Sequence, residues 1–163
     1  MKKPNVDAYL TVIVRDKNGK VVYRRRYKSR SFVVGFLNAL QSAFTGNAIS
    51  SPNLVVGSGT TPPKITDTGL TNQIGNGTGP GQLQYGKDSF TSPNINVNTN
   101  IASFTWSKTF NNGSGGNVTV SEVGAYMQAG SSTYFVLHDL LPSSITLAPN
   151  QVLTVVYTIT IST

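Results

Sequence analysis

Apolar and polar residues alternate with a period of two along much of this chain, and that pattern restricts it to a fold built from β-strands. Successive side chains of a strand point to opposite faces, so the alternation gives each strand one apolar and one polar face. Four such runs occupy residues 101–110, 117–127, 133–141 and 152–162, and turn-forming residues separate them. The pattern predicts a mainly β protein, an antiparallel β-sandwich of jelly-roll-like type.

Two further β-prone runs, residues 8–16 and 20–28, flank Asn18 and Gly19. An Asn-Gly pair in this setting predicts a β-hairpin with a two-residue type I′ turn, because both central positions of that turn need positive φ. Position 13 would then pair with 24, and 11 with 26. One face of the hairpin is apolar apart from Arg25: Leu10, Val12, Val14, Val21, Tyr23 and Tyr27. The other face carries cations around two aliphatic residues: Arg15, Arg24, Arg26, Lys28, Ile13 and Val22.

Residues 31–45 have the spacing of a helix, with Ser31 as the expected N-cap and Gly46 just past the end. One apolar stripe of this helix is expected to lie against a sheet: Val33, Phe36, Leu37, Leu40 and Phe44. Residues 53–56 read as a short strand. Residues 71–100, rich in Gly, Asn, Gln and Pro, are expected to form an exposed excursion. We expect residues 1–163 to form a single domain.

Positive charge is concentrated at the start of the chain. Ten of the thirteen Lys and Arg residues lie within the first thirty positions, against two aspartates, whereas the rest of the chain holds three lysines and four acidic residues. So few charges favour a surface that is covered by further copies of the chain. The basic face has three interpretations: contact with nucleic-acid phosphates, contact with an acidic patch of a neighbouring subunit, or a solvated surface. The candidate contact residues are Arg15, Arg24, Arg26, Lys28 and Arg30.

Residues with catalytic potential are few and scattered. Residues 67–69 (Asp-Thr-Gly) match the short signature of aspartic proteases, but one copy could act only in a homodimer, and a turn is favoured. His138 and Asp139 have no suitably spaced nucleophile and are read as a strand-end pair, and Glu122 as a mid-strand carboxylate. Residues 57–61 lack the Lys-Ser/Thr of a phosphate-binding loop. We expect no enzyme, no cofactor, no metal site and no small-molecule substrate.

No apolar run after the N-terminus is long enough for a signal peptide, and none approaches the roughly 18 residues of a membrane span. We therefore expect a protein made in the host cytoplasm, with no membrane partner, that leaves the cell by lysis or within a particle. The absence of cysteine excludes disulfides and thiolate zinc sites.

An ordered set of segments resembles small virion structural proteins (tail, fibre or head-associated) of tailed bacteriophages and related prokaryotic viruses. It begins with LVVGSGTTPP at residues 54–63 and TDTGL at 66–70, followed by an aromatic-containing strand with SFTW at 103–106. Three strands then follow in the same order, with VSEVGA at 120–125, FVLH at 135–138 and VLTVVYTIT at 152–160. Together with the N-terminal hairpin and helix, the resemblance covers the chain from residue 1 to 163.

This resemblance implies a non-enzymatic virion component, a capsid or tail protein present in many copies that contacts other virion proteins, with packaged nucleic acid as a further candidate partner. We expect self-assembly through the polar sheet faces, and location in the virion. The unusually basic hairpin departs from the family pattern. Two other functions are open: a free nucleic-acid-binding module, or a carbohydrate-binding fibre module with Trp106, Tyr126 or Tyr134 exposed.

Overall fold

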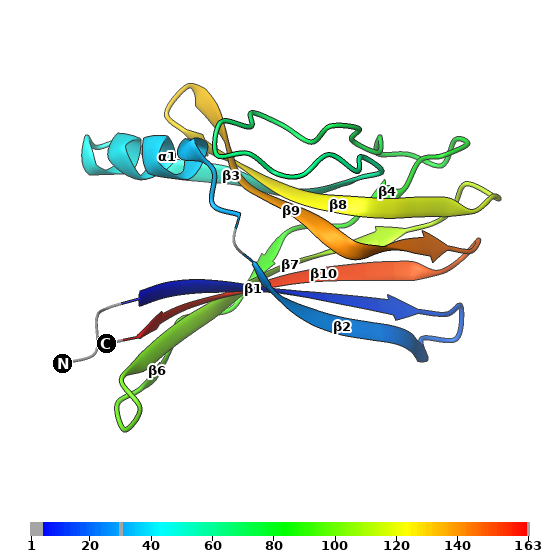
Figure 1. Ribbon diagram of the computed structural model, residues 1–163, viewed down its shortest axis with the longest axis horizontal. Helices are drawn as coiled ribbons and strands as arrows, with labels where there is room; N and C mark the ends of the chain where they lie inside the picture. The colour runs from blue at the N-terminus through cyan, green and yellow to red at the C-terminus, as the bar shows by residue number, and fades with distance from the viewer. Residues whose placement is uncertain (1–4, 30, 163) are drawn as a thin grey trace.

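The computed structural model describes residues 5–29 and 31–162, which form two antiparallel sheets and one helix (Figure 1). The larger sheet has the order β2-β1-β10-β7, and three short strands also pair with β7. Its strands are β1 (Asn5–Arg15), β2 (Val21–Ser29), β4 (Gln84–Tyr85), β5 (Ser89–Phe90), β6 (Asn94–Asn96), β7 (Ile101–Asn111) and β10 (Val152–Ser162). The smaller sheet, with the order β3-β8-β9, contains β3 (Ile49–Gly57), β8 (Val118–Ala129) and β9 (Ser132–Leu147). The helix is α1 (Val34–Phe44).

The two sheets stack face to face, and the alternating residues form the core between them (Figure 1). Leu10, Tyr157 and Trp106 are in register across β1, β10 and β7, and all three side chains are almost completely buried. The inner face of the smaller sheet packs against them through residues such as Val123 and Leu137. The predicted β-sandwich is confirmed. The prediction rested on the apolar faces of the strands, and these faces form the core.

Residues 71–100 are less exposed than predicted. Positions 91–100 are exposed throughout, but Ile74 and Leu83 are buried in the core. The buried ammonium of Lys108 on β7 also holds this segment, because its Nζ lies 2.8 Å from an oxygen of Asp88. The other oxygen of Asp88 accepts a hydrogen bond from Nε1 of Trp106 at 2.8 Å. Lys108, at a core-facing position of β7, therefore helps to hold residues 71–90 against the sheets, whereas residues 91–100 are exposed throughout, as predicted.

The hairpin has the predicted register in its middle but a different turn. Position 13 pairs with 24 and 11 with 26, as expected. The backbone N–H of Gly19 donates to the carbonyl of Asp16, and Gly19 has a φ of +80°, which gives a three-residue turn in place of the two-residue type I′ turn. A bulge beside Arg15 restores the register, and Val21 is consequently exposed although it was assigned to the apolar face.

The helix differs from the prediction at its start and in its buried face. Ser31 does not cap it, since α1 begins at Val34 and the Ser31 hydroxyl donates to Asp139. Residues 31–33 are extended beside β9, where the N–H of Val33 donates to the carbonyl of Val136. The helix buries its small residues, Gly35 and Ala39, against the sheet. Three members of the predicted buried stripe are instead exposed: Leu37, Leu40 and Phe44.

Gly35 makes this close approach possible, and Gly35→Ala is expected to destabilise the protein. A Cβ at position 35 would collide with the backbone carbonyl oxygen of Phe135, which cannot move without disturbing β9. Overpacking of this kind costs about 1–3 kcal/mol. Gly116→Ala is the matched control because nothing lies near a Cβ there. Urea unfolding should show a lower midpoint for Gly35→Ala alone, and equal midpoints for both variants would contradict this helix packing.

Candidate functional site

The predicted contact residues lie together on the outer face of the hairpin, turned away from the core. Arg24, Arg26 and Lys28 alternate along β2 on the side opposite the half-buried Tyr23 and Tyr27, and all three are exposed. Residues two apart in a strand are about 6.7 Å apart, so these cations form an evenly spaced row. Arg15 lies on the corresponding face of the neighbouring strand β1. Arg30 lies outside the described residues. We call Arg15, Arg24, Arg26 and Lys28 the basic face.

Tyr9 is a member of this face that the sequence analysis did not single out. It is on β1 opposite Lys28, and the guanidinium carbon of Arg26 lies 4.3 Å from the centre of its ring. A cation over an aromatic ring at this distance is held by the ring quadrupole. Tyr9, Arg26, Lys28 and Thr160 surround a shallow open hollow of about 480 Å³. The period of two could have predicted this position, because residues 9, 11, 13 and 15 share one face of β1, and that face also carries Arg15.

All six acidic side chains of the chain are engaged within the molecule. Two serve the hairpin itself, because Asp7 lies 2.7 Å from Nζ of Lys28 and Asp16 accepts from two backbone N–H groups of the turn. The other four each accept two or more hydrogen bonds from core or loop groups: Asp67, Asp88, Glu122 and Asp139. The described surface therefore carries no free acidic patch, and the one carboxylate that contacts the basic face is that of Asp7, which pairs with Lys28.

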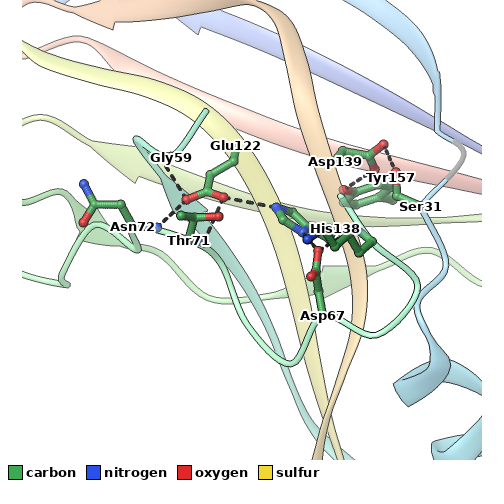
Figure 2. Close-up of polar contacts among 10 residues, drawn as sticks. Ser31, Gly59, Asp67, Thr71, Asn72, Glu122, His138, Asp139 and Tyr157 are labelled. Carbon is green, nitrogen blue, oxygen red and sulfur yellow. Dashed lines mark hydrogen bonds and ion pairs between the residues drawn. The ribbon is translucent and has the colours of Figure 1, made fainter. Parts of the chain in front are cut away.

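Three residues from separate parts of the sequence meet beneath the loops that cover the smaller sheet. Figure 2 shows His138 lying between the carboxylates of Glu122 and Asp67. Its Nδ1 is 2.6 Å from Asp67 Oδ2, and its Nε2 is 3.1 Å from Glu122 Oε2. The imidazole and Glu122 are almost completely buried. Only the doubly protonated ring can donate to both carboxylates, so this geometry suits an imidazolium between two anions.

We expected His138 and Asp139 to form a pair at the end of a strand. Both instead lie within β9 and are buried. Successive strand residues face opposite ways, so His138 lies on the outer face of the smaller sheet and Asp139 on its inner face. Asp139 accepts hydrogen bonds from the hydroxyls of Ser29, Ser31 and Tyr157. Burial raises the pKa of the Tyr157 hydroxyl well above its ordinary value, and the neighbouring Asp139 carboxylate raises it further. This cluster joins the two sheets.

The carboxylate of Glu122 occupies the place where the glycine-rich residues 57–61 could have held a phosphate. Its two oxygens accept backbone hydrogen bonds from Gly59, Thr71 and Asn72 at 2.8–3.1 Å. A Cβ at Gly59 would overlap the carboxylate, which explains the glycine. The N–H of Gly59, like those of Thr71 and Asn72, is thus satisfied by an internal anion.

The Asp67–His138–Glu122 cluster has the arrangement of a structural cluster, which connects β8, β9 and the loop that contains Asp67. Both ring nitrogens of His138 are hydrogen-bonded to carboxylates. A general base needs a free nitrogen within reach of a nucleophile. Among residues 5–29 and 31–162, no group of three or more His, Asp or Glu side chains is arranged to hold a metal ion. In that same part of the chain, no helix combines the length and apolar character needed to span a bilayer.

The stability of the protein is expected to fall in acid through Asp67, and Asp67→Asn should remove that dependence. Burial raises the pKa of Asp67, but the N–H of Lys64 and the nearby His138 lower it more, so the net pKa lies below the ordinary 3.8. A carboxyl whose pKa is lowered on folding stabilises the protein above its unfolded pKa and loses that contribution as the pH falls through its folded pKa. Urea unfolding between pH 2 and pH 7 measures this. A constant difference between wild type and Asp67→Asn across that range would contradict it.

Comparisons with known proteins found no matching family model, no matching curated protein and no matching solved structure.

Proposed function

We propose that this protein is a non-enzymatic structural subunit of a prokaryotic virus particle, a capsid or tail component present in many copies, whose basic face contacts the sugar-phosphate backbone of nucleic acid. The ordered sequence segments that resemble virion proteins support the first half. The observation that carries the second half is the segregation of charge: four cations share one sheet face with a single carboxylate, that of Asp7, which pairs with Lys28, while the other acidic side chains are engaged elsewhere in the molecule.

Nucleic acid suits this face better than a second copy of the chain does. An acidic patch on a neighbouring identical subunit would need free carboxylates, and the described surface offers none. Phosphates supply a dense row of negative charge, and Lys and Arg bind it without reading base sequence. An acidic partner protein would have to be a different chain.

The rest of the outer face of the larger sheet is compatible with the same contact. β10 and β7 present hydroxyl side chains in register, with Thr154 opposite Thr109, Thr158 opposite Thr105 and Thr160 opposite Ser103. Hydroxyl groups donate hydrogen bonds to phosphate oxygens and bring no repelling charge. The basic face therefore borders a neutral hydrogen-bonding surface, over which a backbone could run.

Of the two alternative functions, the geometry disfavours the carbohydrate-binding module. A carbohydrate-binding module stacks sugars on exposed aromatic rings, but Trp106 is completely buried and donates to Asp88. Tyr126 and Tyr134 are half-buried. A free nucleic-acid-binding module has the same basic face as a virion subunit, so the two differ only in assembly.

The test combines DNA binding with direct observation of assembly. Binding of labelled duplex DNA across a salt series should give a linear fall of log affinity against log salt, with a slope of roughly −0.9 for each phosphate contacted, or about −3 to −4 here. Negative-stain microscopy of the same purified protein should show shells, rings or tubes. Salt-dependent binding by single molecules only would favour the free module, and absence of binding at low salt would overturn the nucleic-acid contact.

A further inference from the structure

The side of α1 turned away from the smaller sheet is apolar and uncovered. Leu37, Leu40 and Phe44 are spaced by three and four residues, which places them on one stripe of the helix. Their exposed fractions are 62%, 39% and 82%, and Ile49 at the start of β3 adds a side chain that is 44% exposed. We call these four residues the helix patch.

Beside this stripe lies an apolar recess. Six residues of α1, β3 and β8 line about 90 Å³ with almost no polar surface: Phe36, Ala39, Leu40, Ala43, Ile49 and Met127. The recess forms because Ala39 and Ala43 are small, which leaves space between the helix and Met127. It has room for the end of a branched aliphatic side chain.

A second uncovered apolar surface lies at the end of the larger sheet where β1 begins and β10 ends (Figure 1). Val6, Ile161 and Ile95 share one sheet face, because Val6 pairs with Ile161 and both Ile161 and Ile95 pair with Ala102. Val97 follows in the turn that leads into β7. These four side chains, which we call the tip patch, are 52–77% exposed, and Figure 1 shows the β6–β7 turn projecting from the body.

Both patches are electrically neutral in a chain whose hairpin is strongly cationic. Residues 31–63, which contain α1 and the start of β3, include no Asp, Glu, Lys, Arg or His, and neither do residues 89–107, which contain β6 and most of β7. Of the fourteen large apolar side chains that are exposed among the described residues, eight belong to these two patches. Monomeric proteins rarely leave such surfaces uncovered, and uncharged apolar surfaces best match each other.

We propose that the tip patch of one copy docks on the helix patch of the next, with Val97 entering the recess beside Leu40. The two patches differ in shape, one projecting and one recessed, and one lies on α1 and β3 while the other lies on the larger sheet, so the contact joins unlike surfaces of identical chains. Such a contact repeats from copy to copy and gives a ring or a filament. Neither patch includes a residue of the basic face, which every copy in the row therefore keeps available.

This contact deepens the repeated-subunit half of the proposed function and is independent of the nucleic-acid half. It is tested on the full chain without nucleic acid, by light scattering and sedimentation over a range of concentrations. Wild type should exceed the mass of one chain as concentration rises. Leu40→Asp and Val97→Asp should each remain at the mass of one chain, because a buried unpaired carboxylate is strongly unfavourable at a dry contact. Val21→Asp, at a valine of the hairpin that is 44% exposed, should associate like wild type.

A mixture of the two variants distinguishes this contact from a symmetric one. Leu40→Asp retains an intact tip patch and Val97→Asp an intact helix patch, so an equimolar mixture should form pairs and nothing larger. Association by either variant alone would overturn the proposal, as would a mixture that stays at the mass of one chain, or a wild type that never associates. Circular dichroism and thermal unfolding verify that both variants fold, which their exposed positions favour.

Cross-linking gives a second measurement that does not depend on disrupting the contact. The chain has no cysteine, so Leu40→Cys/Val97→Cys carries only the two introduced thiols. Mild oxidation should convert it into a ladder of disulfide-linked multimers, whereas an equimolar mixture of the two single variants should stop at linked pairs. If the double variant gives no ladder, the contact is wrong. DNA affinity of Leu40→Asp at one site should equal that of wild type, so a failed contact would leave the nucleic-acid proposal standing.

Discussion

Arg24→Glu/Arg26→Glu is expected to lower the affinity for duplex DNA by about 100-fold or more at low salt, because it replaces two phosphate contacts with two repulsions. The slope of log affinity against log salt should decrease by about 2, roughly one for each cation removed. Both side chains are exposed, so the free energy of unfolding should change by no more than about 0.5 kcal/mol each. Fluorescence anisotropy with labelled duplex at several salt concentrations measures both effects.

The matched control for that variant is Lys64→Glu/Lys87→Glu, which changes the net charge equally at two exposed lysines outside the hairpin. It should retain most of the affinity and all of the wild-type slope. Equal losses in the two double variants would mean that net charge, and not the basic face, governs binding. In a producing host, Arg24→Glu/Arg26→Glu should abolish assembly or genome retention, and a wild-type yield of filled particles would rule out the proposed role of the hairpin.

Glu122→Ala is expected to lower the free energy of unfolding by about 3–5 kcal/mol, as removal of one partner from a buried charge pair does. The change removes the acceptor for the N–H groups of Gly59, Thr71 and Asn72, and it leaves His138 with Asp67 alone. For a chain of this length each kcal/mol corresponds to about 2–4 °C, so Tm should fall by roughly 10 °C. Thermal and urea unfolding followed by circular dichroism measure the loss.

Glu122→Gln separates the loss of hydrogen bonds from the loss of charge. Its carbonyl oxygen can still accept from Gly59 and Asn72, so its destabilisation should be smaller than that of Glu122→Ala. Hydrogen exchange should accelerate in both variants at the backbone N–H groups of the loops that Glu122 holds. If the free energy of unfolding of Glu122→Ala lies within about 1 kcal/mol of the wild-type value, the buried carboxylate does not anchor these loops.

The hairpin shows which structural features a local sequence pattern can predict. Alternation placed Leu10 and Val12 inside and Arg24 and Arg26 outside, because the side-chain period of a strand is fixed by its backbone. The turn was wrong, since Asn-Gly is compatible with both a two-residue and a three-residue loop. The compensating bulge left the central register unchanged, so the error affected only the turn and the residues next to it, from Arg15 to Val22.

The helix shows where local pattern fails. Its stripe of Leu37, Leu40 and Phe44 satisfied the spacing of a buried face, yet the helix packs through Gly35 and Ala39. Which side of a helix is buried depends on how closely its backbone can approach the partner, and small residues allow the closer approach. The larger side chains of the stripe remain exposed.

Local sequence pattern is enough to predict the class of the fold, the faces of the strands and the segregation of charge, because each of these depends on residues close together in the chain. The folded structure is needed to show that Asp67, His138 and Glu122 meet, that all six carboxylates are engaged, and that two neutral apolar surfaces remain uncovered. Those outcomes depend on contacts between residues far apart in sequence. Such contacts are fixed by sheet pairing and loop packing, on which a local pattern carries no information.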